Sequence, residues 1–317
     1  MTRKTQARRA DLRPTMDATG EPPREGQTFA GQSLLVRYVN FVKLPHTVFA
    51  LPFALLGVVY ASTVAAVTTV KVGLVIVAFT AARFAAMGFN RIVDREADAR
   101  NPRTRDRELP AGRLSVRAAG AAVTGGAAVF VVASGLLNRV CLYLSPVALA
   151  WILGYSYTKR WTYWSHFWLG AALAIAPVGG YLAIAGAWSK PAWTLLVLAL
   201  AVAAWVGGFD VFYALQDEEF DRQHGLKSAI VALGRSRAIL AAKLAHGLTI
   251  ALLVGFGAGA GLGAAYYVGI VVAAVLLVWE HRLVKPDDLS RLDAAFFTMN
   301  GVMSIVVFLG ALADRVI

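Results

Sequence analysis

The sequence has very little cysteine and a small share of charged residues. Cys141 is the one cysteine in 317 residues, which excludes an internal disulfide and any zinc or iron–sulfur centre built on several cysteines. Charged side chains make up 16% of the chain, and acidic residues are the rarer kind, with 19 Asp and Glu against 31 Lys and Arg. An ordinary soluble domain carries about 25% charged residues. The shortage of charge therefore points away from a soluble globular protein.

Long apolar runs take the place of the missing charge. Hydrophobic residues make up 58% of the chain and the mean hydropathy is +0.59. Arg83 is the one charged residue between Val72 and Phe89. Several runs approach the length of about 20 residues that crosses a hydrocarbon core, and lipid leaves helices as the open-edged solution. The sequence predicts an all-α polytopic membrane protein with nine transmembrane helices, at residues 46–66, 70–90, 116–137, 140–158, 166–187, 192–216, 236–258, 263–281 and 293–314.

The excess of basic residues lies between these runs. A formal net charge of +12 would by itself suit a nucleic-acid binder. The Lys and Arg residues, however, gather in alternate connections, which is the bias of cytoplasmic loops. We therefore predict contact with membrane lipid and no nucleic acid, in a multi-pass protein of the inner (cytoplasmic) membrane with its N-terminus inside and its C-terminus outside. Residues 1–36, polar and without apolar periodicity, are expected to be a disordered cytoplasmic tail, and residues 37–317 a single transmembrane domain.

Ten of the 19 acidic residues gather in two stretches, which follow the second and the sixth apolar run. Their oxygen-bearing side chains recur at intervals of four or seven residues, which places them on one face of a helix. Like charges on one face repel, so such a row is unfavourable unless cations lie against it. A carboxylate within the bilayer, as expected for Asp210, is expensive and marks a functional site. The two rows are Asn90, Asp94 and Asp98, and Asp210, Asp217 and Asp221.

These rows suit a hard divalent cation. No Cys–His set lies near them, and Mg²⁺ prefers a few carboxylates, retained water and phosphate oxygens. A diphosphate bound where membrane helices meet the cytoplasm implies a lipid tail, so the pattern predicts a polyprenyl diphosphate as substrate. Basic side chains beside the rows can hold the phosphate oxygens that the metal leaves free. The candidates are Arg103, Arg107, Arg222 and Lys227.

Both stretches resemble the signatures of the UbiA superfamily of intramembrane aromatic prenyltransferases. The first reads N-R-x-x-D-x-x-x-D from Asn90, and the second reads D-x-x-Y-x-x-x-D-x-x-x-D from Asp210. "YSYTKR" at residues 155–160 looks like the family's element at the end of the fourth span, and the likeness covers residues 37 to about 315. Glu108 stands where many members have proline. The closest-looking branch comprises 4-hydroxybenzoate polyprenyltransferases and the similar enzymes of the futalosine route to menaquinone.

The resemblance implies a nine-helix bundle of the UbiA type that transfers a polyprenyl group to the ring of a hydroxyaryl carboxylic acid. The acceptor is 4-hydroxybenzoate or a hydroxynaphthoate, in ubiquinone or menaquinone biosynthesis. Two Mg²⁺ ions, held by the six side chains of the two rows, clamp the diphosphate. Aromatic faces stabilise the allylic cation, and Tyr155, Tyr157 and Tyr213 are the candidates. The acceptor's carboxylate needs a cation, for which Lys43 and Arg160 are favoured.

Other classes predict different patterns. A transporter would spread charges along a path through several spans, whereas here they gather at one side of the membrane. A phosphatidyltransferase would need a DGxxAR-type arrangement, which the sequence lacks. A non-catalytic polyprenyl-diphosphate binding or transport protein needs the same diphosphate site as the enzyme, so the sequence leaves that alternative open.

Overall fold

The computed structural model describes residues 29, 31, 33–43, 47, 49–188, 191–284, 289 and 298–316. The regular elements in these ranges are helices, which confirms the predicted all-α class. They are α1 (Leu34–Phe41), α2 (Leu51–Ala61), α3 (Thr69–Val93), α4 (Arg95–Arg100), α5 (Val116–Leu137), α6 (Arg139–Trp161), α7 (Ser165–Ala185), α8 (Ala192–Ala214), the 3-10 turn η2 (Leu215–Asp217), α9 (Glu218–Gln223), α10 (Ala229–Leu233), α11 (Arg235–Ala260), α12 (Ala264–Leu283) and α14 (Asn300–Val316).

Seven helical segments of the described ranges are long and apolar enough to cross a membrane, so the chain is a multi-pass membrane protein. The predicted spans at 46–66 and 293–314 correspond to α2, with 11 residues, and α14, with 17, so a count of nine full crossings is not confirmed. α2 packs against α7 and α14, and most of its side chains are buried. A helix enclosed by its neighbours need not match the thickness of the lipid.

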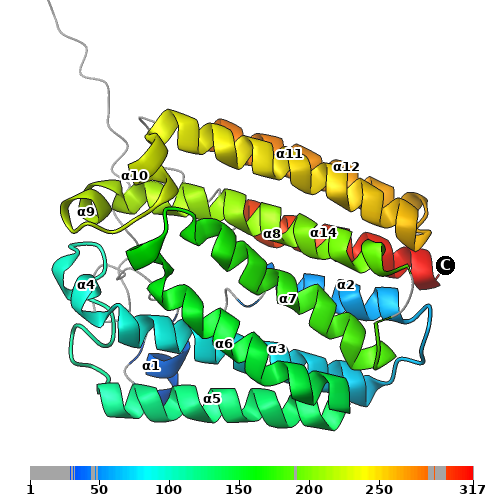
Figure 1. The fold of residues 1–317 in the computed structure, drawn as a ribbon, viewed down its shortest axis with the longest axis horizontal. Coiled ribbons are helices and arrows are strands. Elements are labelled where there is room, and N and C mark those ends of the chain that lie inside the picture. Colours follow the sequence, from blue (N-terminus) through cyan, green and yellow to red (C-terminus); the bar gives the residue numbers. More distant parts are fainter. Residues whose placement is uncertain are drawn as a thin grey trace, which may run out of the picture.

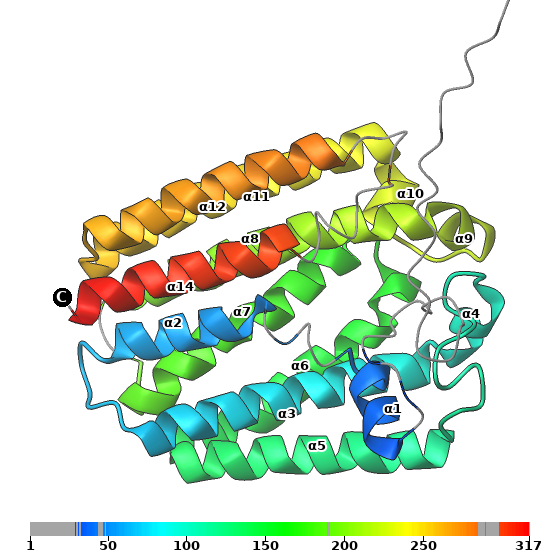
Figure 2. The same cartoon turned by 180° about the vertical axis from the view of Figure 1, so that it is seen from behind.

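The long helices run side by side, with α11 and α12 along one side of the bundle and α5 along the opposite side (Figures 1 and 2). α4, α9 and α10 gather at one end, and the C-terminus lies at the other end (Figure 1). α1 lies at the same end as α4 (Figure 2). Both acidic stretches therefore meet at one end of the bundle. This is expected for stretches that follow the second and the sixth apolar run, because an even number of crossings separates them.

The helices are interrupted at both acidic stretches, so the helix face expected for each row is divided between successive elements. α3 ends at Val93, and Asp94 joins it to α4. α8 ends at Ala214, and η2 carries the chain through Asp217 into α9. Aspartate is a weak helix former, and like charges stacked along one face repel. Each row is divided between two helices, which lets side chains from the loops reach its carboxylates.

Small residues let α2 and α7 approach closely. A Cβ on Gly57 would lie 2.0 Å from the carbonyl oxygen of Pro177, and one on Gly180 would lie 2.0 Å from the carbonyl oxygen of Ala54. Such contacts take the place of a hydrophobic driving force between helices in lipid. The two glycines hold one wall of the bundle in register with α7, which carries part of the site described below.

The first helix begins slightly before the predicted end of the tail. The Ser33 hydroxyl accepts a hydrogen bond from the backbone N–H of Val36, which caps α1 at Leu34. Residues 34–36, expected in the tail, are therefore helical. Residues 1–28 lie outside the described residues.

Candidate active site

A cavity of about 440 Å³ opens among the helices at the end that carries α4 and α9. All five aspartates of the two predicted rows line it, as does Asn90. Away from this polar mouth, the lining becomes apolar and continues between α3, α5, α6 and α7 to Leu137, Cys141 and Leu182. On α3 it extends from Asn90 to Val75, roughly 22 Å along the helix axis. The cavity thus joins a charged mouth to a long apolar channel.

The first row is held by amide and guanidinium groups. Asn90 Nδ2 donates to Asp94 Oδ2 at 2.9 Å. Asp98 Oδ1 accepts from Arg107 Nη1 at 2.7 Å, and Asp98 Oδ2 lies 3.8 Å from Arg91 Nη1. Burial raises the pKa of the Asp94 carboxyl to about 6. Burial therefore disfavours the charged form of Asp94, and a cation bound beside it would favour that form.

Side chains from the segment after α4 donate hydrogen bonds to the second row. Arg103 donates to both oxygens of Asp217, from Nε at 3.0 Å and from Nη2, and Asn101 Nδ2 donates to Oδ1 at 3.0 Å. Asp221 lies 3.7 Å from Lys159 Nζ on α6. The two acidic stretches, more than 100 residues apart in sequence, are therefore joined directly at the mouth of the cavity.

The donor set fits Mg²⁺ bound together with a phosphate ligand. Asp98 Oδ2 and Asp221 Oδ2 are buried and have no hydrogen-bond partner among the described residues, so each has capacity for a cation. No group of three Asp, Glu, His or Cys side chains in the described ranges is placed to hold a metal alone. Mg²⁺ is usually held by one or two carboxylates, water and substrate phosphates rather than by an all-protein cage.

Tyr213 lies under two basic side chains. Its hydroxyl accepts from Lys43 Nζ and from Arg103 Nη1, each at 3.3 Å. Both cations also face its ring, at 5.8 and 5.4 Å from the centroid. Lys43 has a φ of 48°, which is strained for a residue other than glycine and is typical of functional positions. The Tyr213 ring is occupied by protein cations, whereas the Tyr155 ring lines the cavity without such a partner in the described part of the chain.

Three predicted site residues do not line the cavity. Tyr157 stacks on Trp161, with ring centroids 6.2 Å apart, and lies under Arg160. The exposed Arg222 pairs with a glutamate on its own helix. Lys227 Nζ donates to the carbonyl of Trp161. The predicted residues that do line the cavity are Lys43, Asn90, Asp94, Asp98, Arg103, Arg107, Tyr155, Arg160, Asp210, Tyr213, Asp217 and Asp221.

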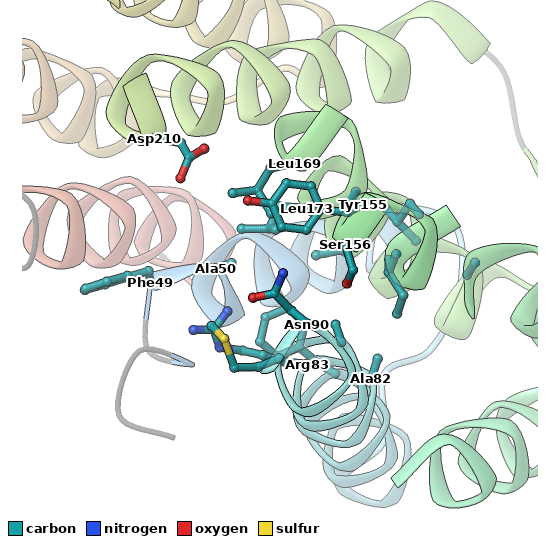
Figure 3. Close-up of a pocket in the computed structure, with 18 of the residues that line it drawn as sticks. Phe49, Ala50, Ala82, Arg83, Asn90, Tyr155, Ser156, Leu169, Leu173 and Asp210 are labelled. Carbon is teal, nitrogen blue, oxygen red and sulfur yellow. The ribbon is translucent and has the colours of Figure 1, made fainter. Parts of the chain in front are cut away.

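Sequence reasoning missed three residues at the cavity. Arg83 lies on α3 two helical turns beyond Asn90, about 10 Å deeper in the bundle, and its buried Nε has no hydrogen-bond partner among the described residues. Its isolation in an apolar run was the available signal. Lys159 belongs to the "YSYTKR" motif, and His166, on α7, contacts Asp210. Figure 3 shows Asn90 and Arg83 on one side of the cavity and Asp210 and Tyr155 across from them.

Comparisons with known proteins agree with this geometry. The UbiA prenyltransferase family model matches residues 50–302. The 4-hydroxybenzoate octaprenyltransferase of Pseudomonas aeruginosa (strain LESB58) is 33% identical over 232 residues, which cover 73% of this chain and 77% of that protein. The enzyme of the same name from Alkalilimnicola ehrlichii is 33% identical over 236 residues, covering 73% and 78%.

Solved structures give the same result for the fold. The apo structure of a UbiA homologue from Aeropyrum pernix K1 matches with a TM-score of 0.77 and 33% identity, over 86% of this chain and 98% of that one. A UbiA homologue from Archaeoglobus fulgidus, solved with GPP and Mg²⁺, matches in fold with a TM-score of 0.65 and 19% identity, over 89% and 100% of the two chains. The predicted membership of the UbiA superfamily is confirmed. The chain belongs to the UbiA prenyltransferase family and is an enzyme of the prenyltransferase class, similar to 4-hydroxybenzoate polyprenyltransferases.

Proposed function

We propose that this enzyme transfers a polyprenyl group from polyprenyl diphosphate to the ring of a hydroxyaryl carboxylic acid in a Mg²⁺-dependent reaction. The acceptor is 4-hydroxybenzoate or a hydroxynaphthoate, as in ubiquinone or menaquinone biosynthesis. The main support is one observation: two rows of carboxylates meet at the mouth of a single cavity whose far part is apolar. A diphosphate with a lipid tail has the same division between a charged and an apolar end.

The mouth of the cavity provides the diphosphate site. Magnesium, when bound, neutralises the diphosphate and makes it a better leaving group. Three basic side chains pair with carboxylates of the rows and line the cavity, and we assign the phosphate oxygens to them: Arg103, Arg107 and Lys159. The A. fulgidus homologue with this fold binds GPP and Mg²⁺, which supports the assignment. The side chains proposed to hold two Mg²⁺ ions are Asn90, Asp94, Asp98, Asp210, Asp217 and Asp221.

The apolar channel takes the prenyl chain and excludes water. Breaking the C–O bond to the diphosphate leaves an allylic cation, which the electron-rich ring of the acceptor attacks to form a C–C bond. The ring then loses a proton and becomes aromatic again. Water would trap the cation, and the apolar lining of the channel disfavours water there. Among the predicted tyrosines we assign the stabilising ring to Tyr155, because Tyr213 already faces two protein cations.

Arg83 is the cation that we assign to the carboxylate of the acceptor. Lys43 and Arg160, favoured from the sequence, already contact Tyr213 and the carbonyl of Val93. Arg83 instead lies in the apolar depth of the cavity, and its Nε has no hydrogen-bond partner in the part of the chain that the structure describes. An arginine inside the bilayer is costly unless it serves a ligand, and a guanidinium matches a carboxylate with two parallel hydrogen bonds.

We extend the proposal to the orientation of the protein in the membrane and to the limits of its domain. The basic connections support an active site at the cytoplasmic face of the inner membrane, with the N-terminus inside. Helices from both halves of the chain line one cavity, which supports a single transmembrane domain from residue 37 onward. Its partners are the polyprenyl diphosphate, the hydroxyaryl acid and membrane lipid.

The direct test incubates membranes containing the full chain with Mg²⁺, a polyprenyl diphosphate and a panel of hydroxyaryl acids. Products are identified by mass. We expect one prenylated acid, and no product from Asp94→Asn or Asp217→Asn, because each removes a carboxylate charge at the metal site.

Asp106→Asn is the matched control, since this exposed aspartate belongs to the first acidic stretch but does not line the cavity. It should keep wild-type turnover. Undiminished product in excess EDTA, or from either inactive variant, would contradict the metal assignment. Binding of the diphosphate without product from any acceptor would instead identify a non-catalytic carrier.

A further inference from the structure

His166 is a fully buried imidazole at the edge of the cavity. It lies in the first turn of α7, is 0% exposed and lines the cavity beside Asp210. Its Nδ1 lies 2.7 Å from Asp210 Oδ2, and its Nε2 lies 3.3 Å from the backbone nitrogen of Ala229. Both ring nitrogens therefore have a partner, one in the carboxylate row and one at the start of α10.

These two partners fix the proton on the ring. A backbone N–H can only donate, so His166 Nε2 must be the unprotonated acceptor of the bond from Ala229. The remaining ring proton then lies on Nδ1 and is donated to Asp210. The two contacts are therefore satisfied together when Nδ1 donates to Asp210 and Nε2 accepts from Ala229.

The contact also connects Asp210, the deepest residue of the second row, to the segment that follows Asp221. Ala229 follows the turn after Asp221, and that turn is joined to α6 by the bond from the Lys227 N–H to the Lys159 carbonyl at 2.7 Å. His166 therefore holds the carboxylate of Asp210 and the start of α10, which follows Asp221, through hydrogen bonds to the same ring. A displacement of either would break a hydrogen bond of His166.

We propose that His166 is a positioning residue that reserves one oxygen of Asp210 and directs the other into the cavity, toward the metal–diphosphate site. This inference rests on the proposed function. Side chains that hydrogen-bond to a metal-binding carboxylate usually fix its orientation, and their loss reduces metal affinity or activity by about 10- to 100-fold. His166 supplies that support from outside the two aspartate rows.

The test compares two substitutions of similar length in the purified full chain. His166→Gln keeps one donor and one acceptor on a planar amide, whereas His166→Met keeps neither. Calorimetric titration of Mg²⁺ in the presence of inorganic diphosphate measures affinity without turnover. We expect His166→Met to weaken the apparent Mg²⁺ affinity by about 10- to 100-fold, and His166→Gln to bind about tenfold more tightly than His166→Met.

A buried histidine elsewhere provides the control. His246, on α11, is 2% exposed and does not line the cavity. His246→Met should lower the melting temperature as other core losses do, yet leave the Mg²⁺ affinity unchanged. Equal loss in His166→Gln and His166→Met would overturn the positioning role.

A double-mutant cycle decides whether His166 acts through Asp210. In an Asp210→Asn background, His166→Met should cause little further loss of affinity, since the group it orients is already changed. A full further loss would show an independent effect and overturn the inference. Failure of the proposed function is a separate result: no acceptor would be prenylated by the wild type, while the difference between the two His166 variants in metal binding would remain.

Discussion

Arg83→Met is the substitution that tests the acceptor site most sharply. Arg83 is half-buried, faces the cavity and has an Nε without a hydrogen-bond partner among the described residues. Methionine is unbranched, like arginine, and it is apolar, like the rest of the channel lining. The wall of the channel therefore stays filled while the charge is lost. The protein loses no internal hydrogen bond of that Nε, and its melting temperature should not fall.

The expected loss follows from the chemistry of the contact. Removing one partner of a buried, hydrogen-bonded charge pair costs about 2–5 kcal/mol. That range corresponds to a decrease of roughly 30- to 5000-fold in kcat/KM for the aromatic acid. The KM for the polyprenyl diphosphate should stay near the wild-type value, because Arg83 lies about 10 Å from the carboxylate rows along α3.

The assay measures kcat/KM for 4-hydroxybenzoate and for its neutral amide, 4-hydroxybenzamide. The wild type should prefer the acid, and Arg83→Met should lose that preference while keeping activity toward the amide. Lys43→Met serves as the comparison, since Lys43 is the cation favoured from the sequence. If Arg83→Met reduces turnover of acid and amide equally, or if Lys43→Met alone removes the preference, the assignment of Arg83 is refuted.

Three further predictions concern the metal site, the channel and the fold. Burial raises the pKa of Asp94 to about 6, so a proton competes with Mg²⁺ at this carboxylate. Calorimetry should therefore show weaker Mg²⁺ binding as the pH falls from about 7 to 5. Asp94→Asn should lose the part of this pH dependence that comes from Asp94. Ala82→Phe should shift the product spectrum, read by mass, to shorter prenyl chains, because Ala82 lines the channel; an unchanged spectrum would show that the chain lies elsewhere. Gly180→Ala should lower the melting temperature, because its Cβ would meet the Ala54 carbonyl at 2.0 Å, whereas Gly179→Ala has open space and should not.

The bends at the acidic stretches show where sequence periodicity stops being informative. Spacing of four residues in the first stretch predicts one continuous helical face. The structure divides that face at Asp94, and a 3-10 turn divides the second stretch at Asp217. Periodicity describes an isolated helix, whereas in the folded chain Asp98, Asp217 and Asp221 lie against basic side chains from other segments. The sequence predicts which carboxylates belong to the site, but it does not predict which basic side chains contact them.

Arg83 and Arg222 also show that position along the chain does not predict which side chains share a cavity. Arg222 follows an aspartate of the second row and was expected at the phosphate, yet it is exposed and pairs with Glu218. Arg83 is remote from both rows in sequence, yet it lines their cavity. Proximity along the chain favoured the first, and only the packing of α3 against its neighbours identifies the second. A single charge in an apolar run was nevertheless a usable signal.

The membrane environment and the chemical class of the ligand were predictable from the order of the residues. Long runs without charge indicate a membrane, because a soluble core of this size would not enclose them, and repeated carboxylates beside arginines led to the prediction of a cation and a phosphate ligand. Only the packing of the helices shows which side chains share the cavity, that His166 contacts Asp210, and that Arg83 faces the channel. Those relations depend on how closely helices approach, as at Gly57 and Gly180, and the approach is set by contacts between segments that no local pattern contains.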